Sequence, residues 1–145
     1  MKWTQNLDKL NPWFLTGFAD AESCFYIGVL QSIKVKTGWE IQPEFKIELH
    51  EKDVHILENI KNYFEGIGQI ILKKDKSIYR VRSIKDLQLI VKHFDTYPLI
   101  SNKYGDYILF KTVLNIMLVK DHLTEAGLLK ILSLKASLNL GLLDK

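Results

Sequence analysis

The alternation of apolar and polar positions changes from a helical to a strand-like period near residue 23. Leu15, Phe18 and Ala19 recur at helical spacing after Asn11, a good N-cap, and Pro12, which fits a first helical position. Beyond Glu22 the period becomes two, in runs at about 24–30 and 41–49 separated by a polar turn near 34–38. This pattern predicts a helix of about three turns followed by a β-hairpin.

A second hairpin is predicted further along, with strands at about 69–72 and 78–82. Each hairpin has an apolar side and a polar side. The apolar side of the second predicted strand carries Ile41, Pro43, Phe45, Ile47 and Leu49, and its polar side carries Gln42, Glu44, Lys46 and Glu48. In the second hairpin Tyr79 and Val81 lie opposite Arg80 and Arg82. Four apolar residues are also expected on the polar side: Leu30, Ile70, Leu72 and Ile78.

Helices are predicted between and after the hairpins. The first begins near Asp53 and stops at Gly66 and Gly68, and the next begins at a capping-box variant at Ser83 and ends near Phe94. Two more are expected at about 103–120 and from Thr124 to Gly141. The order predicts an α+β fold, with helices covering one face of an antiparallel sheet, in a single domain over residues 1–145.

Composition supports one globular domain and points weakly to nucleic acid. The chain has 145 residues, 47% of them hydrophobic, and its 20 basic and 17 acidic residues give a net charge of +3. Six of the basic residues and a single acidic residue fall between 73 and 85. The lone cysteine, Cys24, excludes an internal disulfide framework, and no apolar run is long enough to span a bilayer, so we expect no membrane association.

The segment Leu15-Thr16-Gly17-Phe18-Ala19-Asp20-Ala21-Glu22-Ser23 resembles the nine-residue signature of the LAGLIDADG homing endonucleases. Flanking residues 11–14 and blocks at 49–53, 97–100, 102–107, 122–128 and 135–142 resemble the branch found in fungal mitochondrial introns. The resemblance implies an αββαββα-like fold with a saddle-shaped sheet and an organelle-encoded protein acting in the mitochondrion. Its substrate would be double-stranded DNA.

The resemblance also implies roles for individual residues. Glu22 would bind Mg²⁺ or Mn²⁺ together with the Ala21 carbonyl, and Lys103 would lie near the scissile phosphate. A chain with one motif supplies one site, so two copies would pair through the bare stripe of Gly17 and Ala21. Such a homodimer would cut both strands and leave short 3′ overhangs.

The polar sides of the hairpins are the predicted DNA-reading surface, because a β-ribbon fits the major groove. The predicted base contacts come from Tyr26, Lys34, Lys36, Gln42, Lys46, Arg80 and Arg82. Phosphate contacts are expected from Lys73, Lys74 and Lys76, while Glu40, Glu44 and Glu48 either accept from cytosine amino groups or weaken binding.

Three alternatives remain open on the sequence. The chain could be an RNA-splicing maturase that binds intron RNA, in which case Glu22 would not be needed. It could be half of a longer protein with two motifs. Finally, Ser23 stands where the family usually has glycine, which allows a catalytically weak DNA-binding remnant.

Overall fold

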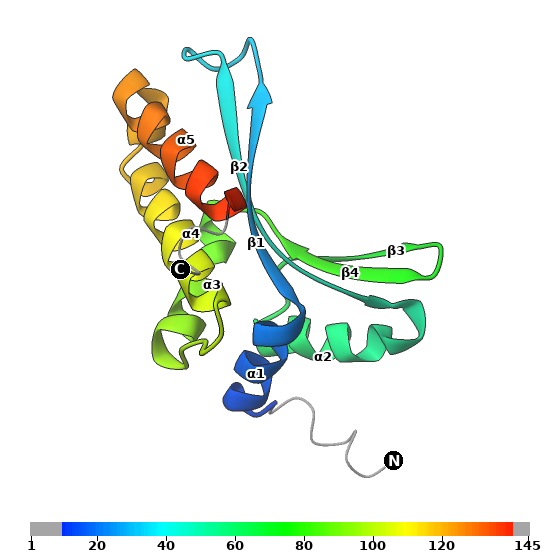
Figure 1. Cartoon of the computed structure of the whole chain (residues 1–145). Coiled ribbons are helices and arrows are strands. Elements are labelled where there is room, and N and C mark those ends of the chain that lie inside the picture. The colour runs from blue at the N-terminus through cyan, green and yellow to red at the C-terminus, as the bar shows by residue number, and fades with distance from the viewer. Residues whose placement is uncertain (1–9, 141–145) are drawn as a thin grey trace. The chain divides into compact units, whose positions relative to one another are not determined.

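The computed structural model describes residues 10–140 and has the α+β architecture that the pattern predicts (Figure 1). Its elements, in chain order, are α1 (Pro12–Glu22), β1 (Ser23–Gln31), β2 (Trp39–His50), η2 (Glu51–Asp53), α2 (Val54–Tyr63), β3 (Gln69–Lys73), β4 (Lys76–Val81), α3 (Ile84–Thr96), α4 (Lys103–Leu118), η3 (Asp121–Leu123) and α5 (Glu125–Leu140). The strands form one antiparallel sheet in the order β1-β2-β4-β3. The predicted fold class is confirmed.

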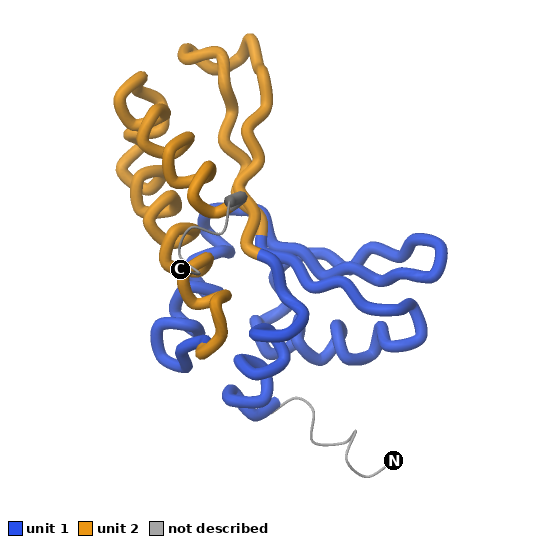
Figure 2. The backbone as a smooth tube through the Cα atoms, in the orientation of Figure 1, with its two compact units in different colours: residues 1–24, 45–99 blue, residues 25–44, 100–145 orange. Residues whose placement is uncertain are grey.

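The chain divides into two compact units (Figure 2). The first contains Met1–Cys24 and Phe45–Leu99, and the second contains Phe25–Glu44 and Ile100–Lys145. Boundaries between the units fall inside β1, after Cys24, and inside β2, before Phe45, so each of these strands contributes residues to both units.

In the first unit, the cross-strand register separates an apolar face from a polar face. Opposite residues lie on the same face of a sheet, and Phe45 pairs with Val81 while Ile47 pairs with Tyr79. These four side chains are buried together with residues of the helices, among them Leu15, Ala19, Leu57, Ile60, Leu87, Ile90 and Phe94. The first unit therefore has its own core.

Strand β3 differs from the prediction by one residue in phase. Ile70 pairs with Tyr79 and Leu72 with Ser77, so both lie on the apolar face, and the expectation that they belong to the polar face is wrong. Ile71, opposite Ile78, takes that place. The two-residue turn between Lys73 and Lys76 sets this register, with Asp75 at φ 64°.

Local signals explain where the helices of the first unit begin and end. The Asn11 side chain accepts hydrogen bonds from the amides of Trp13 and Phe14 at 2.8 and 3.3 Å, which caps α1. Ser83 accepts from the amide of Asp86 at 3.4 Å and caps α3. After α2 the backbone takes positive φ at Glu65 and Gly66, as the predicted glycine stop requires.

In the second unit, the hairpin β1–β2 packs on helix α4 through aromatic side chains. Phe25 contacts Tyr107 and Phe110 with ring centroids 5.5 and 5.3 Å apart. Helices α4 and α5 lie side by side (Figure 1). Thr124 caps α5 by accepting from the amide of Gly127 at 3.0 Å. A Cβ at Gly127 would lie only 1.9 Å from the Asp121 carbonyl oxygen, so glycine is required there. The predicted end of this helix at Gly141 lies outside the described residues.

Candidate functional site

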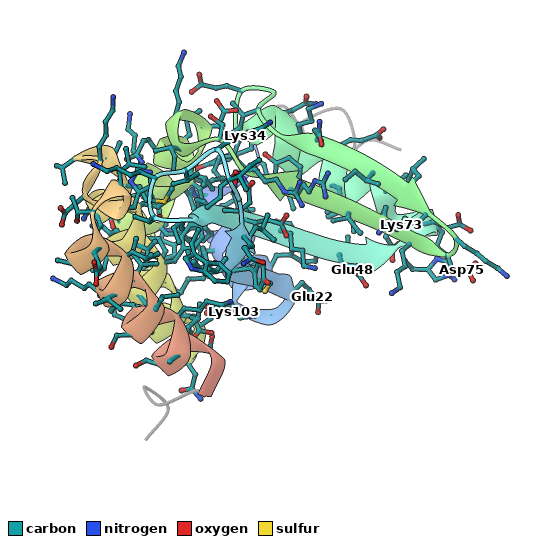
Figure 3. The ribbon with its side chains drawn as sticks, turned by 90° about the horizontal axis from the view of Figure 1, so that it is seen from above. Glu22, Lys34, Glu48, Lys73, Asp75 and Lys103 are labelled. Atoms are coloured by element: carbon teal, nitrogen blue, oxygen red, sulfur yellow. The ribbon has the colours of Figure 1, made fainter. Side chains whose placement is uncertain are left out.

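Glu22 is exposed at the C-terminal end of α1, in the first unit (Figure 3). No basic residue occupies the last turn of this helix. The carboxylate therefore faces the negative end of the helix dipole, an unfavourable placement that a cation would relieve. The exposed Ala21 also belongs to this last turn, where carbonyl groups have no partner within the helix. A carboxylate and a free carbonyl are oxygen ligands of the kind that Mg²⁺ or Ca²⁺ prefers.

Ser23, which stands where the family signature usually has glycine, fits the end of α1 without distorting it. It is buried, and its hydroxyl donates a hydrogen bond to the Ala19 carbonyl at 2.7 Å. Its backbone is extended, with φ −89° and ψ 164°, a conformation that does not require glycine. The serine hydroxyl thus supplements the end of α1 rather than distorting it.

One face of α1 is exposed and mostly apolar. Phe14 is 52% exposed, and Gly17 and Ala21 are also exposed, at the spacing of a helical stripe. The Phe18 ring stacks on the Phe14 ring with centroids 6.1 Å apart. A Cβ built on Gly17 would meet nothing within 4 Å, so the described chain does not itself require glycine at this position.

The opposite side of α1 is held by a buried polar chain. Thr16 donates to the Tyr97 carbonyl at 2.8 Å and lies 3.0 Å from His93 Nε2. Because Thr16 has only one hydroxyl hydrogen, it accepts from His93, which places the ring hydrogen on Nε2. His93 Nδ1 then accepts from the Tyr63 hydroxyl at 2.9 Å. The chain ties the motif helix to α2 and α3.

Burial fixes the protonation states along this chain. Desolvation lowers the pKa of His93 to about 4, so the imidazole is neutral near pH 7. Burial, with a smaller contribution from Tyr97, raises the pKa of Tyr63. Both groups therefore stay uncharged, as the directed hydrogen bonds require.

The polar face of the first unit brings together several residues that were predicted to contact DNA. The cross-strand register sets three rows on this face: Lys46, Arg80 and Gln69; Glu48, Ile78 and Ile71; His50, Lys76 and Lys73. Lys76 forms an ion pair with Glu48 at 3.3 Å, which offsets part of its charge. Lys73, Lys74 and Arg82 are exposed, and Lys73 and Asp75 lie near the tip of the β3–β4 hairpin (Figure 3).

The second unit holds the remaining predicted DNA contacts. Lys34 and Lys36 are exposed in the turn between β1 and β2. Tyr26 and Gln42 flank Gly28, where a Cβ would lie 3.3 Å from the Tyr26 ring and from the Gln42 carbonyl oxygen. Glu44 is only 8% exposed, so the expectation of a surface acceptor at this residue is wrong. Tertiary packing covers it despite its place in the alternating pattern.

Lys135 of α5 is a contact that sequence reasoning missed. Its ammonium donates to the Ile27 carbonyl at 2.5 Å and lies 4.6 Å from the centroid of the Tyr26 ring. The signal in the sequence was two lysines, Lys130 and Lys135, in a largely apolar helix, and the pattern alone does not indicate which of them is covered. The contact covers a carbonyl of β1, an edge strand of the sheet.

Lys103 is the first residue of α4 and belongs to the second unit. Its amide hydrogen-bonds the Ser101 hydroxyl at 3.1 Å, and its side chain is half-buried. Its predicted role beside the scissile phosphate stays a prediction.

Within residues 10–140, no three His, Cys, Asp or Glu side chains gather as a metal-binding group. A cation at Glu22 would therefore need ligands from beyond these side chains. None of the helices in that same part of the chain is both long and apolar enough to cross a bilayer.

Comparison with known proteins identifies the family. The family model described as LAGLIDADG endonuclease matches residues 15–114. "Probable intron-encoded endonuclease 2" of Neurospora crassa is 46% identical over 136 residues, which cover 92% of this chain and 30% of that protein. The meganuclease I-CpaMI bound to uncleaved DNA superimposes with a TM-score of 0.86 at 49% identity, covering 91% of this chain and 45% of that one.

A second structure, I-SmaMI bound to an uncleaved DNA target in the presence of calcium ions, gives a TM-score of 0.88 at 46% identity and covers 90% of this chain and 45% of that one. The chain thus spans less than half the length of these relatives. The family match covers more than half of the chain, and it includes α1 from Leu15 to Glu22. The chain therefore belongs to the LAGLIDADG endonuclease family.

Proposed function

We propose that this chain forms half of a site-specific, divalent-metal-dependent DNA endonuclease that makes a double-strand break. The single observation that carries the proposal is α1, which presents an exposed carboxylate at one end and an exposed small-residue stripe along one side. Family membership supports this interpretation, and so do the DNA-bound states of I-CpaMI and I-SmaMI.

The metal would be held by Glu22 and the Ala21 carbonyl, with the remaining ligands from a second motif helix, water and DNA phosphate. A divalent ion there activates water and neutralises charge on the phosphate oxygens. The chain itself contributes the fixed position of Glu22, set by Ser23 at the helix end and by the Thr16 contacts behind it. Lys103 would add a positive charge near the scissile phosphate.

Two motif helices are needed because each strand of the duplex requires its own cut. We propose that a second copy of this chain packs against Phe14, Gly17 and Ala21, giving a homodimer with twofold symmetry. Short 3′ overhangs would follow if the paired sites face each other across the minor groove. A second domain of the same kind within a longer protein is the competing arrangement, and the greater length of the relatives favours it.

DNA would be bound along the polar faces of the hairpins. Phosphate contacts would come from Lys73, Lys74 and Lys76, and base contacts from Tyr26, Lys34, Lys36, Gln42, Lys46, Arg80 and Arg82. The relative from Neurospora crassa is named as intron-encoded. By analogy, we propose that this chain is also intron-encoded, acts in the mitochondrion and promotes the spread of its intron.

Glu22→Gln tests the proposal directly. Wild-type chain incubated with a random duplex library and Mg²⁺ should enrich cleaved sites, whereas Glu22→Gln should bind the same sites in Ca²⁺ but cut them at least about 100-fold more slowly, because a neutral amide binds the ion poorly. Glu58→Gln is the matched control, since this exposed glutamate lies on α2. It should cut at the wild-type rate.

Recovery of no cleaved duplex with the wild-type chain, alone or joined to a second copy, would contradict the nuclease proposal. Glu22→Gln also distinguishes the nuclease from an RNA-splicing maturase. A maturase should still support splicing of the intron RNA after this substitution, whereas a nuclease should lose DNA cleavage.

A further inference from the structure

A hollow of about 360 Å³ lies in the first unit where β4 ends and β3 begins. It is lined by Gly68, Gln69, Arg80, Arg82, Ser83 and Asp86. Gly68, at φ +81°, allows the strands to meet here, since a Cβ would lie 2.7 Å from the Arg80 carbonyl oxygen. The hollow therefore combines a close backbone with donors and acceptors of both charges.

Arg80 is the central side chain of this site. It lies between Lys46 and Gln69 in one row of the polar face. Its Nε is buried and has no hydrogen-bond partner. A buried donor without an acceptor costs about 1–3 kcal/mol, so a conformation in which the guanidinium reaches an external acceptor would be favoured.

The carboxylate of Asp86 identifies the kind of acceptor. A phosphate would be attracted by Arg80 and Arg82 but repelled by Asp86, which lines the same hollow. The edge of a base pair carries both acceptors, which the arginines can donate to, and donors, which Asp86 can accept from, so it complements the hollow better than a phosphate does. In the major groove guanine presents two acceptors, O6 and N7, and cytosine presents one amino donor.

We propose that the hollow reads one G·C base pair, with Arg80 donating to guanine O6 and N7 and Asp86 accepting from the cytosine amino group. This inference rests on the proposed function, and it assigns a base identity to one position of the target. Gln69, directly opposite Arg80, would contact the neighbouring base.

The test is a binding selection from a random duplex library in Ca²⁺, where cleavage does not remove the product. Arg80→Met removes the donors to guanine O6 and N7, so it should lose about 10-fold or more of the guanine preference at one position. Asp86→Asn should weaken the preference at the same base pair. Thermal unfolding of each variant checks that it is folded.

Lys73→Met is the matched control because it removes a cation from another row of the same face. It should lower affinity for all sequences without changing the base preferences. If Arg80→Met leaves every base preference unchanged, or lowers affinity for all sequences uniformly as Lys73→Met does, the G·C assignment is wrong while the nuclease proposal stands. If the wild-type chain selects no duplex, both fall.

Discussion

At the scale of single residues, the motif is supported by groups that sequence reading does not connect. Thr16 and His93 are 77 positions apart, yet they share a buried hydrogen bond that leads on to Tyr63. Nothing in local periodicity pairs such distant residues. The caps at Asn11, Ser83 and Thr124 were predictable because each involves only its neighbouring backbone.

The neutral His93 predicts that stability falls in acid. Its pKa is lowered to about 4 in the folded chain, against about 6.5 when unfolded, so between these values the unfolded state binds more protons. The free energy of unfolding should therefore drop by about 2 kcal/mol from this residue between pH 6.5 and pH 5. Urea unfolding of wild type and His93→Gln across this range measures the difference, because the other histidines are present in both. Parallel pH profiles for the two proteins would contradict the assignment.

At the scale of elements, strand phase was predictable only where polar and apolar residues alternate. β2 alternates, and its inward residues were predicted correctly, with Phe45 and Ile47 buried. β3 has three apolar residues in succession, Ile70, Ile71 and Leu72, so the sequence does not show which of them face the core. Pairing with β4 through the Lys74–Asp75 turn decides it. Glu44 shows the opposite case. It alternates with apolar residues as a surface residue should, yet tertiary packing buries it.

Helix α1 yields a prediction in which stability and association move in opposite directions. Gly17→Ala should raise the free energy of unfolding by roughly 0.5–1 kcal/mol, because alanine favours helix and the added methyl meets nothing within 4 Å. The same methyl should weaken self-association about 10-fold if a second helix packs closely here. Chemical unfolding and analytical ultracentrifugation measure the two effects.

Ser133→Ala on the exposed side of α5 is the control for Gly17→Ala and should leave association unchanged. A wild-type chain that remains monomeric on its DNA at every concentration would instead favour the arrangement with a second domain in one longer protein.

At the scale of the whole molecule, net charge says little and the placement of charge says more. The chain carries only +3, but Lys73 and Lys74 are exposed at the end of a hairpin whose turn contains Asp75. The sequence predicted this basic hairpin. It could not reveal that Lys76 is partly neutralised by Glu48, because the ion pair depends on the β2–β4 register.

These exposed lysines predict the salt dependence of DNA binding. A double variant, Lys73→Met with Lys74→Met, should reduce the slope of log affinity against log salt by roughly 2. Each phosphate contact that is lost means that DNA binding releases about one counterion fewer. Fluorescence anisotropy titrations at salt concentrations from about 50 to about 200 mM measure this slope, because affinity that depends on phosphate contacts falls steeply over that range. The double variant Lys120→Met with Lys130→Met also removes two exposed lysines, so it is the charge-matched control and should leave the slope unchanged. Equal slopes for wild type and the double variant would remove these lysines from the interface.

The passage of β2 from one unit into the other constrains how such a protein can be altered. Each unit is assembled from two separated stretches, and β2 supplies a stretch to both. A chimera with a single breakpoint therefore divides at least one unit between two parents. An intact exchange of either unit needs two grafts made together, with one junction inside β1 and another inside β2.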